Sequence, residues 1–398
     1  MKNLIPKRRF EEFKNSDPWE QRELGSLTNI KTGSSDLQDA VDDGEYPLFV
    51  RSENIERSNR YIFDGEAILI PGEGRLGEIY HYINGKFDYH QRVYKISNFA
   101  DSNTDGKFVL YYLQRNFKSH ALKFTVKATV DSLRLPMLVG FEIKLPSFKE
   151  QKVIGQFFTN LDNLITLHQR KLDKLKETKS AYLSEMFPKE GEFYPKRRFA
   201  GFTDPWEQRK LGELCIKFTD GDWIESKDQS YEGVRLIQTG NVGVTQYLDK
   251  SNSQKWISEE TFDRLHCEEI FPGDILISRL PEPAGRACII PDIGIKMITA
   301  VDCTIVRTKP EVSNKYLVQY LSTENYFKKV NTSLAGGTRQ RVSRSNLSEF
   351  IVPMPKDEKE QKRIGLLFEN LDNLITLHQR KLDKLQALKQ AYLSEMFV

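Results

Sequence analysis

The chain contains 398 residues, which is long enough for two or three domains with sizeable hydrophobic cores. Its hydrophobic content of 39% and charged content of 29% are typical of a globular protein that is more polar than average. No apolar run approaches the roughly 20 residues of a membrane span, and the first residues lack the apolar core of a signal peptide, so we expect a cytoplasmic protein without a membrane segment.

The net charge and the cysteines set weaker limits. A formal net charge of +3 is too small to indicate nucleic-acid binding by itself, so the distribution of charge along the chain is more informative. The cysteines all lie in the second half without CxxC spacing, at Cys215, Cys267, Cys288 and Cys303. They are typical of reduced residues in a cytoplasmic protein, and we expect no metal site.

A short segment occurs twice, and each copy leads into a variable region. The first lead-in segment runs from Pro6 to Leu27 and the second from Pro195 to Leu214. Both contain basic residues and an Asp-Pro-Trp turn. This pattern predicts that Trp19 and Trp206 anchor the cores that follow them.

Each variable region is expected to combine short strands with a helix. Runs rich in β-branched and aromatic residues, separated by glycine and asparagine turns, indicate strands at 66–70, 78–83, 92–96, 234–238, 274–278, 287–290 and 303–306. One helix is expected in each region, at 107–117 and at 314–330. Such a mixture predicts two domains of the α+β class.

A long repeated helix follows each variable region. Residues 161–175 and 371–385 are identical, and the similarity extends over 150–187 and 360–397. A helix of about 40 residues is about 60 Å long, so neither copy fits inside one small domain. Seam residues recur three and four positions apart, as in a coiled coil. In the two identical strings the seam consists of Leu161, Ile165, His168, Leu172, Leu175, Leu371, Ile375, His378, Leu382 and Leu385.

The repeat also predicts how the two helices pair. Two equal units in one chain tend to pack about a pseudo-two-fold axis, as a homodimer does, which would make the helices antiparallel. Capping boxes are expected at their starts, from Ser147 to Glu150 and from Asp357 to Glu360. His168 and Lys179, with their copies His378 and Lys389, interrupt the seam. They either fix the register as partly exposed polar positions or contact a partner protein.

Two stretches without acidic residues, 107–130 and 325–348, lie just before the long helices. Each contains five basic residues. Their corresponding positions in the two units favour a phosphate-binding track over an ordinary solvated face. The candidate DNA contacts in these stretches, whose side chains suit phosphates or base edges, are Lys118, Lys123, Lys127, Thr338, Arg339, Gln340, Arg341 and Arg344.

The loop from Gly72 to Gly77 matches the GxGxxG pattern formally. A dinucleotide site needs a helix directly after the loop, whereas the residues that follow alternate like a strand. We therefore expect a glycine turn that carries Arg75 towards a ligand. The corresponding turn of the second region, 279–286, would present Arg279 and Arg286.

No motif indicates that the chain performs catalysis. The Asn/Asp-Pro-Pro-aromatic motif of amino-methyltransferases, the GxxxxGK[ST] phosphate loop and the HExxH zinc motif are all absent. The six histidines are scattered, so no nucleophile and base suggest themselves. We expect no catalytic residues.

In the order of its parts, the chain resembles the specificity subunit of a type I restriction–modification enzyme. The resemblance covers nearly the full length. It is carried by the Trp-Glu-Gln-Arg strings at Trp19 and Trp206, by the helix junctions at 145–151 and 354–361, and by the twin helices. The string at 220–224, Asp-Gly-Asp-Trp-Ile, also resembles the start of recognition domains in this family.

The resemblance implies an α+β protein with two target recognition domains, related by a pseudo-two-fold axis and joined by two long helices packed as an antiparallel coiled coil. We expect the first domain at 1–146, the first spacer helix at 147–188, the second domain at 189–355 and the second spacer helix at 356–398. Each domain would read one half of a bipartite site in double-stranded DNA. The first domain lacks a Gly-Gly-Thr-Arg loop, so its base-reading residues are harder to place.

The same resemblance implies the partners. The helices would set the gap between the half-sites and dock two methyltransferase subunits, which bind S-adenosylmethionine and methylate adenine. Motor–nuclease restriction subunits would join with ATP and magnesium, and this chain would bind no cofactor itself. Two other hypotheses stay open: a self-sufficient fused restriction enzyme, and a coiled-coil scaffold without a nucleic-acid role.

Overall fold

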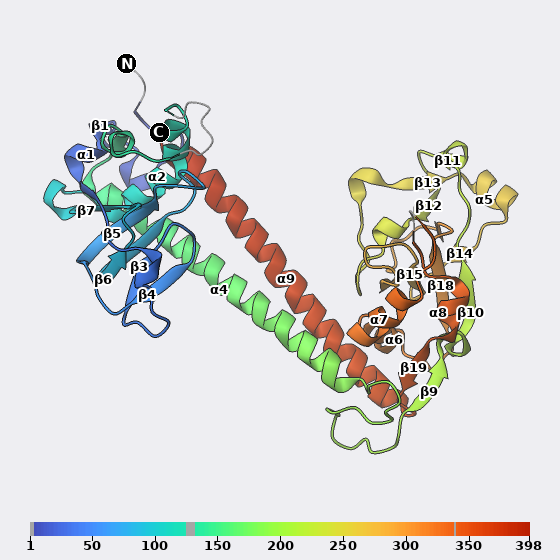
Figure 1. Ribbon diagram of the computed structural model, residues 1–398. Coiled ribbons are helices and arrows are strands. Elements are labelled where there is room, and N and C mark those ends of the chain that lie inside the picture. Colours follow the sequence, from blue (N-terminus) through green and yellow to red (C-terminus); the bar gives the residue numbers. More distant parts are fainter. Residues whose placement is uncertain (1–3, 125–131, 338–339) are drawn as a thin grey trace. The chain divides into compact units, whose positions relative to one another are not determined.

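The computed structural model describes residues 4–124, 132–337 and 340–398. The chain divides into two compact units (Figure 1). The first comprises Met1–Gln169 with Arg380–Val398, and the second comprises Arg170–Gln379. Each unit therefore combines one globular domain with one end of each long helix.

The first unit is built around a six-stranded sheet with the order β2-β7-β5-β6-β3-β4. All neighbouring strands pair antiparallel except β3 and β6, which are parallel. A separate ribbon pairs β1 of the lead-in segment with β8, the last strand before the long helix. The helices and strands are β1 Glu20–Glu23, α1 Leu24–Leu27, β2 Asn29–Thr32, β3 Tyr46–Phe49, β4 Ile55–Ser58, β5 Phe63–Pro71, β6 His81–Tyr89, β7 Val93–Ser97, α2 Gly106–Ala121, α3 Leu135–Val139, β8 Glu142–Leu145 and α4 Phe148–Met186.

The second unit has a different sheet arrangement. A four-stranded sheet has the order β10-β18-β15-β16, and a five-stranded sheet has the order β11-β13-β12-β17-β14. The ribbon of β9 with β19 repeats the β1–β8 ribbon of the first unit. The helices and strands are β9 Glu207–Lys210, β10 Cys215–Asp220, β11 Gln229–Ser230, β12 Val234–Ile237, β13 Lys255–Ile257, α5 Glu259–Leu265, β14 Glu269–Ile270, β15 Ile275–Ser278, β16 Ala287–Ile289, β17 Met297–Thr299, β18 Cys303–Thr308, α6 Asn314–Tyr320, α7 Glu324–Thr332, α8 Arg344–Glu349, β19 Ile351–Met354 and α9 Glu358–Met396.

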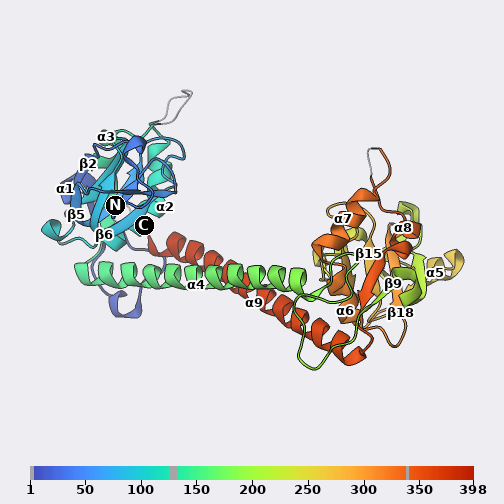
Figure 2. The same ribbon diagram turned by 60° about the horizontal axis from the view of Figure 1, so that its bottom comes forward.

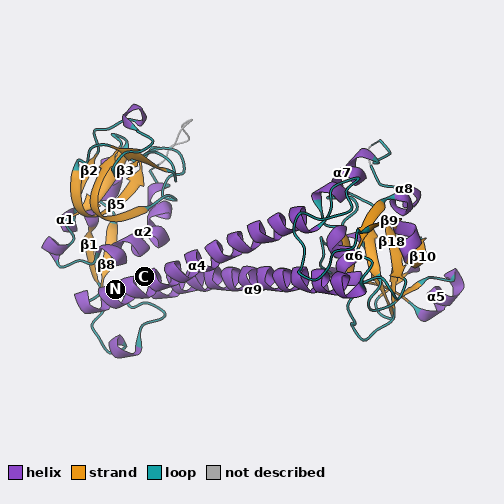
Figure 3. Cartoon of the chain, turned by 90° about the horizontal axis from the view of Figure 1, so that it is seen from below, coloured by secondary structure: helices purple, strands orange, loops and turns teal. Residues whose placement is uncertain are grey.

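The two long helices, α4 and α9, are uninterrupted over 39 residues each (Figure 3). In the first unit the start of α4 packs on the end of α9, where the rings of Phe158 and Phe397 stack at 5.6 Å. In the second unit the end of α4 packs on the start of α9, where Phe187 and Phe368 stack at 6.0 Å. The α+β class and the antiparallel pairing of the helices are confirmed.

Each lead-in segment anchors a core, as the sequence indicated. The side chains of Trp19 and Trp206 are both 1% exposed. Trp19 lies edge-on to Phe397 at 6.4 Å, and Trp206 lies edge-on to Phe187 at the same distance. Each core therefore joins the globular domain to the helix pair, because its aromatic residues come from both.

The start of each long helix differs from the expected capping box. Ser147 accepts a hydrogen bond from the backbone N–H of Glu150, but the Glu150 carboxylate does not turn back to the cap. It forms two hydrogen bonds of 2.7 and 2.6 Å with the guanidinium of Arg9 instead. Glu360 pairs in the same way with Arg198 of the second lead-in segment. The second half of the box is thus replaced by a buried ion pair to the neighbouring segment.

The helix expected at 314–330 is broken in two, so that prediction was wrong. Helix α6 ends at Tyr320, and α7 starts at Glu324. The hydroxyl of Thr323 accepts a hydrogen bond from the backbone N–H of Tyr326 and so caps α7. Thr323 thereby starts a second, separate helix. The helix expected at 107–117 forms within α2.

No helix in the described part of the chain is long and apolar enough to cross a membrane. Across the same residues, no cluster of three or more histidine, cysteine, aspartate or glutamate side chains is arranged to hold a metal ion.

Candidate nucleic-acid interface

Each unit contains its own junction of three chain segments, and backbone hydrogen bonds hold each of the two junctions together in the same way. In the first unit the N–H of Gly72 donates to Arg92 at 2.8 Å, and the N–H of Leu133 donates to Gly72 at 2.8 Å. In the second unit the N–H of Arg279 donates to Asp302 at 2.9 Å, and the N–H of Val342 donates to Arg279 at 3.2 Å. Gly72 and Arg279 are therefore equivalent. Leu133, just after the first basic stretch, and Val342, within the second, thus lie beside the turns that the sequence paired.

The junction of the first unit carries exposed basic side chains that are partly neutralised. Arg75 forms ion pairs with Glu53 at 2.6 Å and with Glu78 at 3.0 Å. Lys118, on α2, binds the second oxygen of Glu78. Hydrogen bonds from Lys118 and Arg75 lower the pKa of Glu78. These side chains are exposed, so a phosphate can compete for their donors at modest cost.

Two further arginines of this junction were missed by the sequence analysis. Arg51 follows β3 and lies 3.2 Å from Glu73, and Arg92 precedes β7 and also binds Glu73. No sequence signal places Arg51 and Arg92 next to Arg75, because they lie on separate strand ends. The GxGxxG loop is followed by strand β6, as predicted, rather than by a helix.

The junction of the second unit has its own arrangement of charge. Arg341 lies 3.5 Å from Asp302, and Arg344 lies 3.9 Å from Asp220. Backbone hydrogen bonds between Ala335 and Arg341 close the base of the glycine-rich loop. Helix α8 follows this loop and contacts β10 (Figure 2). Because Asp302 occupies the place of Arg92 in the first unit, the two junctions present different charges.

Arg279 and Arg286 occupy interior positions, which the sequence did not indicate. The Arg286 guanidinium donates to the carbonyl oxygens of Val242, Leu280, Pro283 and Thr239 at 2.6 to 3.0 Å. Four of its five N–H groups are thus used inside the fold. Burial lowers the pKa of Arg286. The expectation that Arg286 contacts DNA is therefore corrected, because its donors are occupied by backbone carbonyl oxygens inside the fold.

Arg279 lies in the interior, next to the carboxylates that pair with the exposed arginines Arg341 and Arg344. It is 7% exposed and donates to the carbonyl oxygen of Val301 at 2.6 Å. Its guanidinium also lies 3.5 Å from Asp220 and 4.0 Å from Asp302, the carboxylates that face Arg344 and Arg341. Its charge contributes to this surface, but its donors are turned inward.

The remaining candidate contacts are Lys123 and Gln340, which are exposed, and Lys127, Thr338 and Arg339, which lie outside the described residues. The string at 220–224 also holds an exposed side chain that was not among the candidate contacts. Trp223 is 72% exposed and lies three residues after Asp220. Its neighbour Gly221 has no room for a side chain, since an added Cβ would lie 2.3 Å from the carbonyl oxygen of Thr299. The close packing of this turn on Thr299 thus leaves the indole of Trp223 at the surface.

All ten predicted seam residues are buried or half-buried. Leu161, Leu172, Leu371 and Leu382 are buried, and Ile165, His168, Leu175, Ile375, His378 and Leu385 are half-buried. Other leucines of the identical strings face outward. Leu164 and Leu167 are 44% and 46% exposed, and their copies Leu374 and Leu377 are 43% and 46% exposed.

The two lysines that interrupt the seam, Lys179 and Lys389, form equivalent ion pairs. Lys179 lies 2.5 Å from Asp372, and Lys389 lies 2.7 Å from Asp162. Lys389 is the copy of Lys179, and Asp372 is the copy of Asp162. Each helix thus gives a lysine and receives one, as a self-complementary pairing requires.

Comparison with known proteins gives a consistent result. A family model described as type I restriction modification DNA specificity domain matches residues 16–177 and 203–387. The type I restriction enzyme EcoDI specificity subunit of Escherichia coli is 22% identical over 405 residues, which cover 95% of this chain and 88% of that protein. The MjaVIII specificity subunit of Methanocaldococcus jannaschii is 23% identical over 394 residues, covering 94% and 91%.

Solved structures show the same fold. The crystal structure of the S subunit of a type I restriction–modification system from M. genitalium matches with a TM-score of 0.66 and 16% identity, and the match covers 99% of each chain. A chain from work on complex assembly and conformational transition of the type I R-M system matches with a TM-score of 0.50 and 16% identity, covering 95% of this chain and 97% of that one. The family model covers most of the chain in two successive halves, and the chain belongs to the family of type I restriction–modification DNA specificity subunits.

Proposed function

We propose that each globular domain of this specificity subunit reads one half of a bipartite site in double-stranded DNA. We further propose that the long helices set the gap between the halves. As a family member the chain is a non-catalytic component of a restriction–modification complex. The domain limits of 1–146 and 189–355 are part of this proposal.

One observation carries the proposal: the contacts that hold the domains to the helices are duplicated, while the domains themselves differ. The ion pairs of Arg9 with Glu150 and of Arg198 with Glu360 are equivalent. The sheets, in contrast, differ in strand order and number. Identical contacts between domain and helices would hold both domains in the same way, and different domains would allow each to recognise a different DNA sequence.

The chemistry of the two junctions supports contact with DNA. Arg75 and Lys118 in the first unit, and Arg341 and Arg344 in the second, offer exposed cationic donors suited to phosphates. Arginine also binds the O6 and N7 atoms of guanine with two hydrogen bonds. Carboxylates beside each arginine hold its side chain in place and weaken unspecific attraction to DNA.

The exposed leucines of the identical strings support docking of two copies of one partner. Leu164 with Leu167, and Leu374 with Leu377, form two apolar ridges with the same sequence around them. Exposed apolar side chains at two equivalent places fit two equal subunits. We assign these ridges, rather than the covered seam, to the methyltransferase subunits.

The proposed partners would supply the cofactors. The methyltransferase subunits would bind S-adenosylmethionine, and motor–nuclease subunits would use ATP and magnesium, so this chain would need none of them. Because duplex DNA is the proposed substrate, we expect the complex to work in the cytoplasm. A chain of this fold occurs in a structure that concerns the assembly of a type I R-M complex, which supports the proposal that this chain works with partner subunits.

Mapping methylated adenines across the host genome tests the proposal directly. We expect two short specified sequences separated by a gap of constant length. A second experiment replaces residues 28–146 with the corresponding domain of another specificity subunit, and only one half of the recognised sequence should change. A single continuous site, or a change in both halves, would contradict separate reading by two domains.

Two further experiments address the rival functions. Reversing the charge of Arg339, Arg341 and Arg344 should abolish DNA binding and leave partner assembly intact, whereas a pure scaffold would keep its function. Methyl transfer by the isolated chain would indicate a fused enzyme instead. Lengthening a helix should change the gap, and an unchanged gap would refute the role of the helices as a ruler.

A further inference from the structure

Each domain is attached to its helices at two levels, and the second level lies at a repeated aspartate. The first level is the aromatic core around Phe158 in the first unit and Phe368 in the second. Asp162 and Asp372 come four residues later, about 6 Å further along the helix. One attachment point holds a domain but lets it tilt, whereas two points on one helix fix its angle.

In the first unit Asp162 joins both helices and the domain. Its carboxylate is 2.7 Å from Nζ of Lys389 on α9 and accepts a hydrogen bond of 2.8 Å from the hydroxyl of Tyr111 on α2. The Tyr111 ring is 3% exposed and lies 5.1 Å from the ring of Phe158, which belongs to the first attachment level. Tyr111 therefore spans the two levels.

In the second unit Asp372 has the same role with different partners. It accepts a hydrogen bond of 2.5 Å from Lys179 on α4, one of 2.9 Å from Gln319 on α6 and one of 3.0 Å from Thr245. Thr245 has a positive φ of 62°, a costly conformation for a β-branched residue. That backbone conformation places its hydroxyl on the helix.

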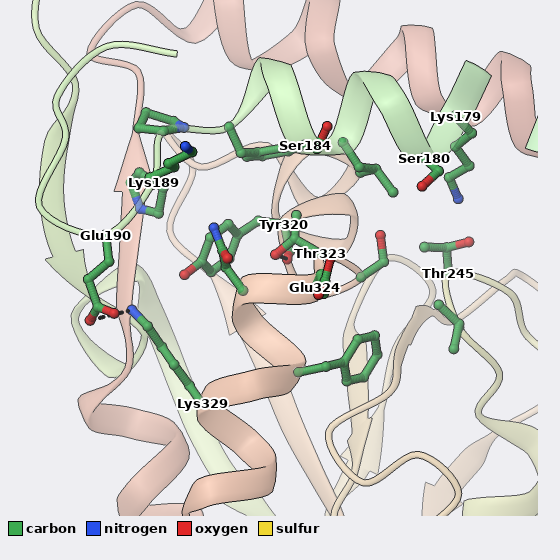
Figure 4. A pocket seen from close by; sticks show the side chains of 18 of the residues that line it. Lys179, Ser180, Ser184, Lys189, Glu190, Thr245, Tyr320, Thr323, Glu324 and Lys329 are labelled. Atoms are coloured by element: carbon green, nitrogen blue, oxygen red, sulfur yellow. Dashed lines mark hydrogen bonds and ion pairs between the residues drawn. The ribbon is translucent and has the colours of Figure 1, made fainter. Parts of the chain in front are cut away.

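Each unit has open space at the junction of domain and helix, and in the second unit this space lies beside the aspartate. In the second unit a cavity of about 1290 Å³ is lined by Lys179, Thr245 and Asp372 among other residues. Figure 4 shows Lys179 of α4 and Thr245 of the domain at this cavity. In the first unit a cavity of about 620 Å³ is lined by Tyr82 and Asp105 of the domain and by Phe157 of α4, about one turn before Asp162. Each junction thus combines a packed aromatic core with open space, so the polar contacts beyond the core contribute to the angle of the domain.

We propose that Asp162 and Asp372 are positioning residues that fix the angle of each recognition domain on the helix pair, and that they thereby restrict the DNA gap the complex accepts. The inference about the gap rests on the proposed function, whereas the inference about the angle does not. The aspartates are identical in both helices, but the groups that the domains offer them differ. A shared helix can thus hold two unrelated domains.

The two domains are not attached to the helices by the same number of polar contacts. The second unit has a further bond one turn beyond Asp372, from the side chain of Gln246 to the hydroxyl of Thr376 at 2.8 Å. Within the described residues, Thr166, the copy of Thr376, has no equivalent bond to the first domain. Removing Asp162 should therefore loosen the first domain more than removing Asp372 loosens the second.

The test compares Asp162→Ala, Asp372→Ala and Tyr111→Phe in the complex with its methyltransferase subunits. Alanine keeps the helix intact because it has the highest helix propensity. The probes are duplexes that carry the genomically mapped site with the native gap, or with a gap one base pair shorter or longer. We expect the preference for the native gap to fall about five-fold for Asp162→Ala, which loses both the ion pair with Lys389 and the hydrogen bond of Tyr111. The fall should be smaller for Tyr111→Phe, which loses only the hydrogen bond, and for Asp372→Ala, because the bond from Gln246 to the helix remains.

Glu369→Ala is the matched control. Glu369 also links α9 to α6, through an ion pair of 2.7 Å with Lys315, but both side chains are substantially exposed. Exposed pairs contribute little, so the gap preference should not change. A merely structural role of the aspartates would lower the unfolding temperature of the variants and leave the gap preference as it was.

A second measurement reports the angle between the first domain and the helix pair in the absence of DNA. Spin labels at Lys149 of α4 and Asn59 of the first domain, both exposed, report the distance between helix and domain by pulsed electron resonance. We expect Asp162→Ala to broaden this distance distribution. An unchanged distribution together with an unchanged gap preference overturns the inference, while the proposed function stands. If the unaltered complex accepts all gaps equally, the ruler function fails, and the distance distribution alone decides whether the aspartates fix the angle.

Discussion

The salt dependence of DNA binding offers a quantitative test of the second junction. Arg341 and Arg344 have side chains that are 59% and 45% exposed, and their carboxylate partners lie 3.5 and 3.9 Å away, so both can reach a phosphate. Each phosphate contact that is lost lowers the slope of log K against log salt by about 0.9. Replacing both arginines with glutamine should lower the slope by about 1.8, and the loss of affinity between 50 and 200 mM salt should be about twelve-fold smaller.

The assay is the titration of a labelled duplex with the assembled complex at four or more salt concentrations. The double variant Lys359→Gln and Lys362→Gln serves as control, because it removes two positive charges from helix α9 of the same unit and should leave the slope unchanged. An equal fall in slope in the control would show that only net charge matters. An unchanged slope in the Arg341 and Arg344 variant would refute the phosphate contacts.

Three further predictions concern stability and assembly. Arg198→Met should cost about 3–5 kcal/mol in denaturant unfolding, because Glu360 is then buried without its partner, and adding Glu360→Gln should restore most of the loss. Burial lowers the pKa of Lys95 to about 8, so the unfolded chain binds more protons between about pH 8 and 10.5 and stability should rise with pH in that window. Lys95→Met should remove this pH-dependent increase in the free energy of unfolding, which is on the order of 1–3 kcal/mol and is measured as a shift of the unfolding midpoint. If the variant keeps the increase, Lys95 is not its cause. Leu164→Ser with Leu167→Ser should reduce the number of methyltransferase subunits from two to one in a mass measurement of the complex, and retention of both would refute docking at that ridge.

The sequence by itself determined the frame of the protein. The identical helices, the paired lead-in segments and the two acid-free stretches are all patterns of local spacing and repetition. From them the fold class, the antiparallel pairing and the burial of Trp19 and Trp206 could be predicted. The helix at 314–330 could not be predicted fully, because its break depends on a single capping residue, Thr323.

Only the tertiary structure decided what individual charged side chains do. Arg286 and Arg341 look alike in the sequence, yet Arg286 binds four carbonyl oxygens in the interior while Arg341 is at the surface. Glu150 resembles a capping residue, but Arg9, far away in sequence, takes its carboxylate. The physical reason is that the partner of a charge is set by long-range packing, whereas helix period and repetition are local. The position of a cation along the chain therefore indicates a site, and its exposure in the fold determines whether it can bind DNA.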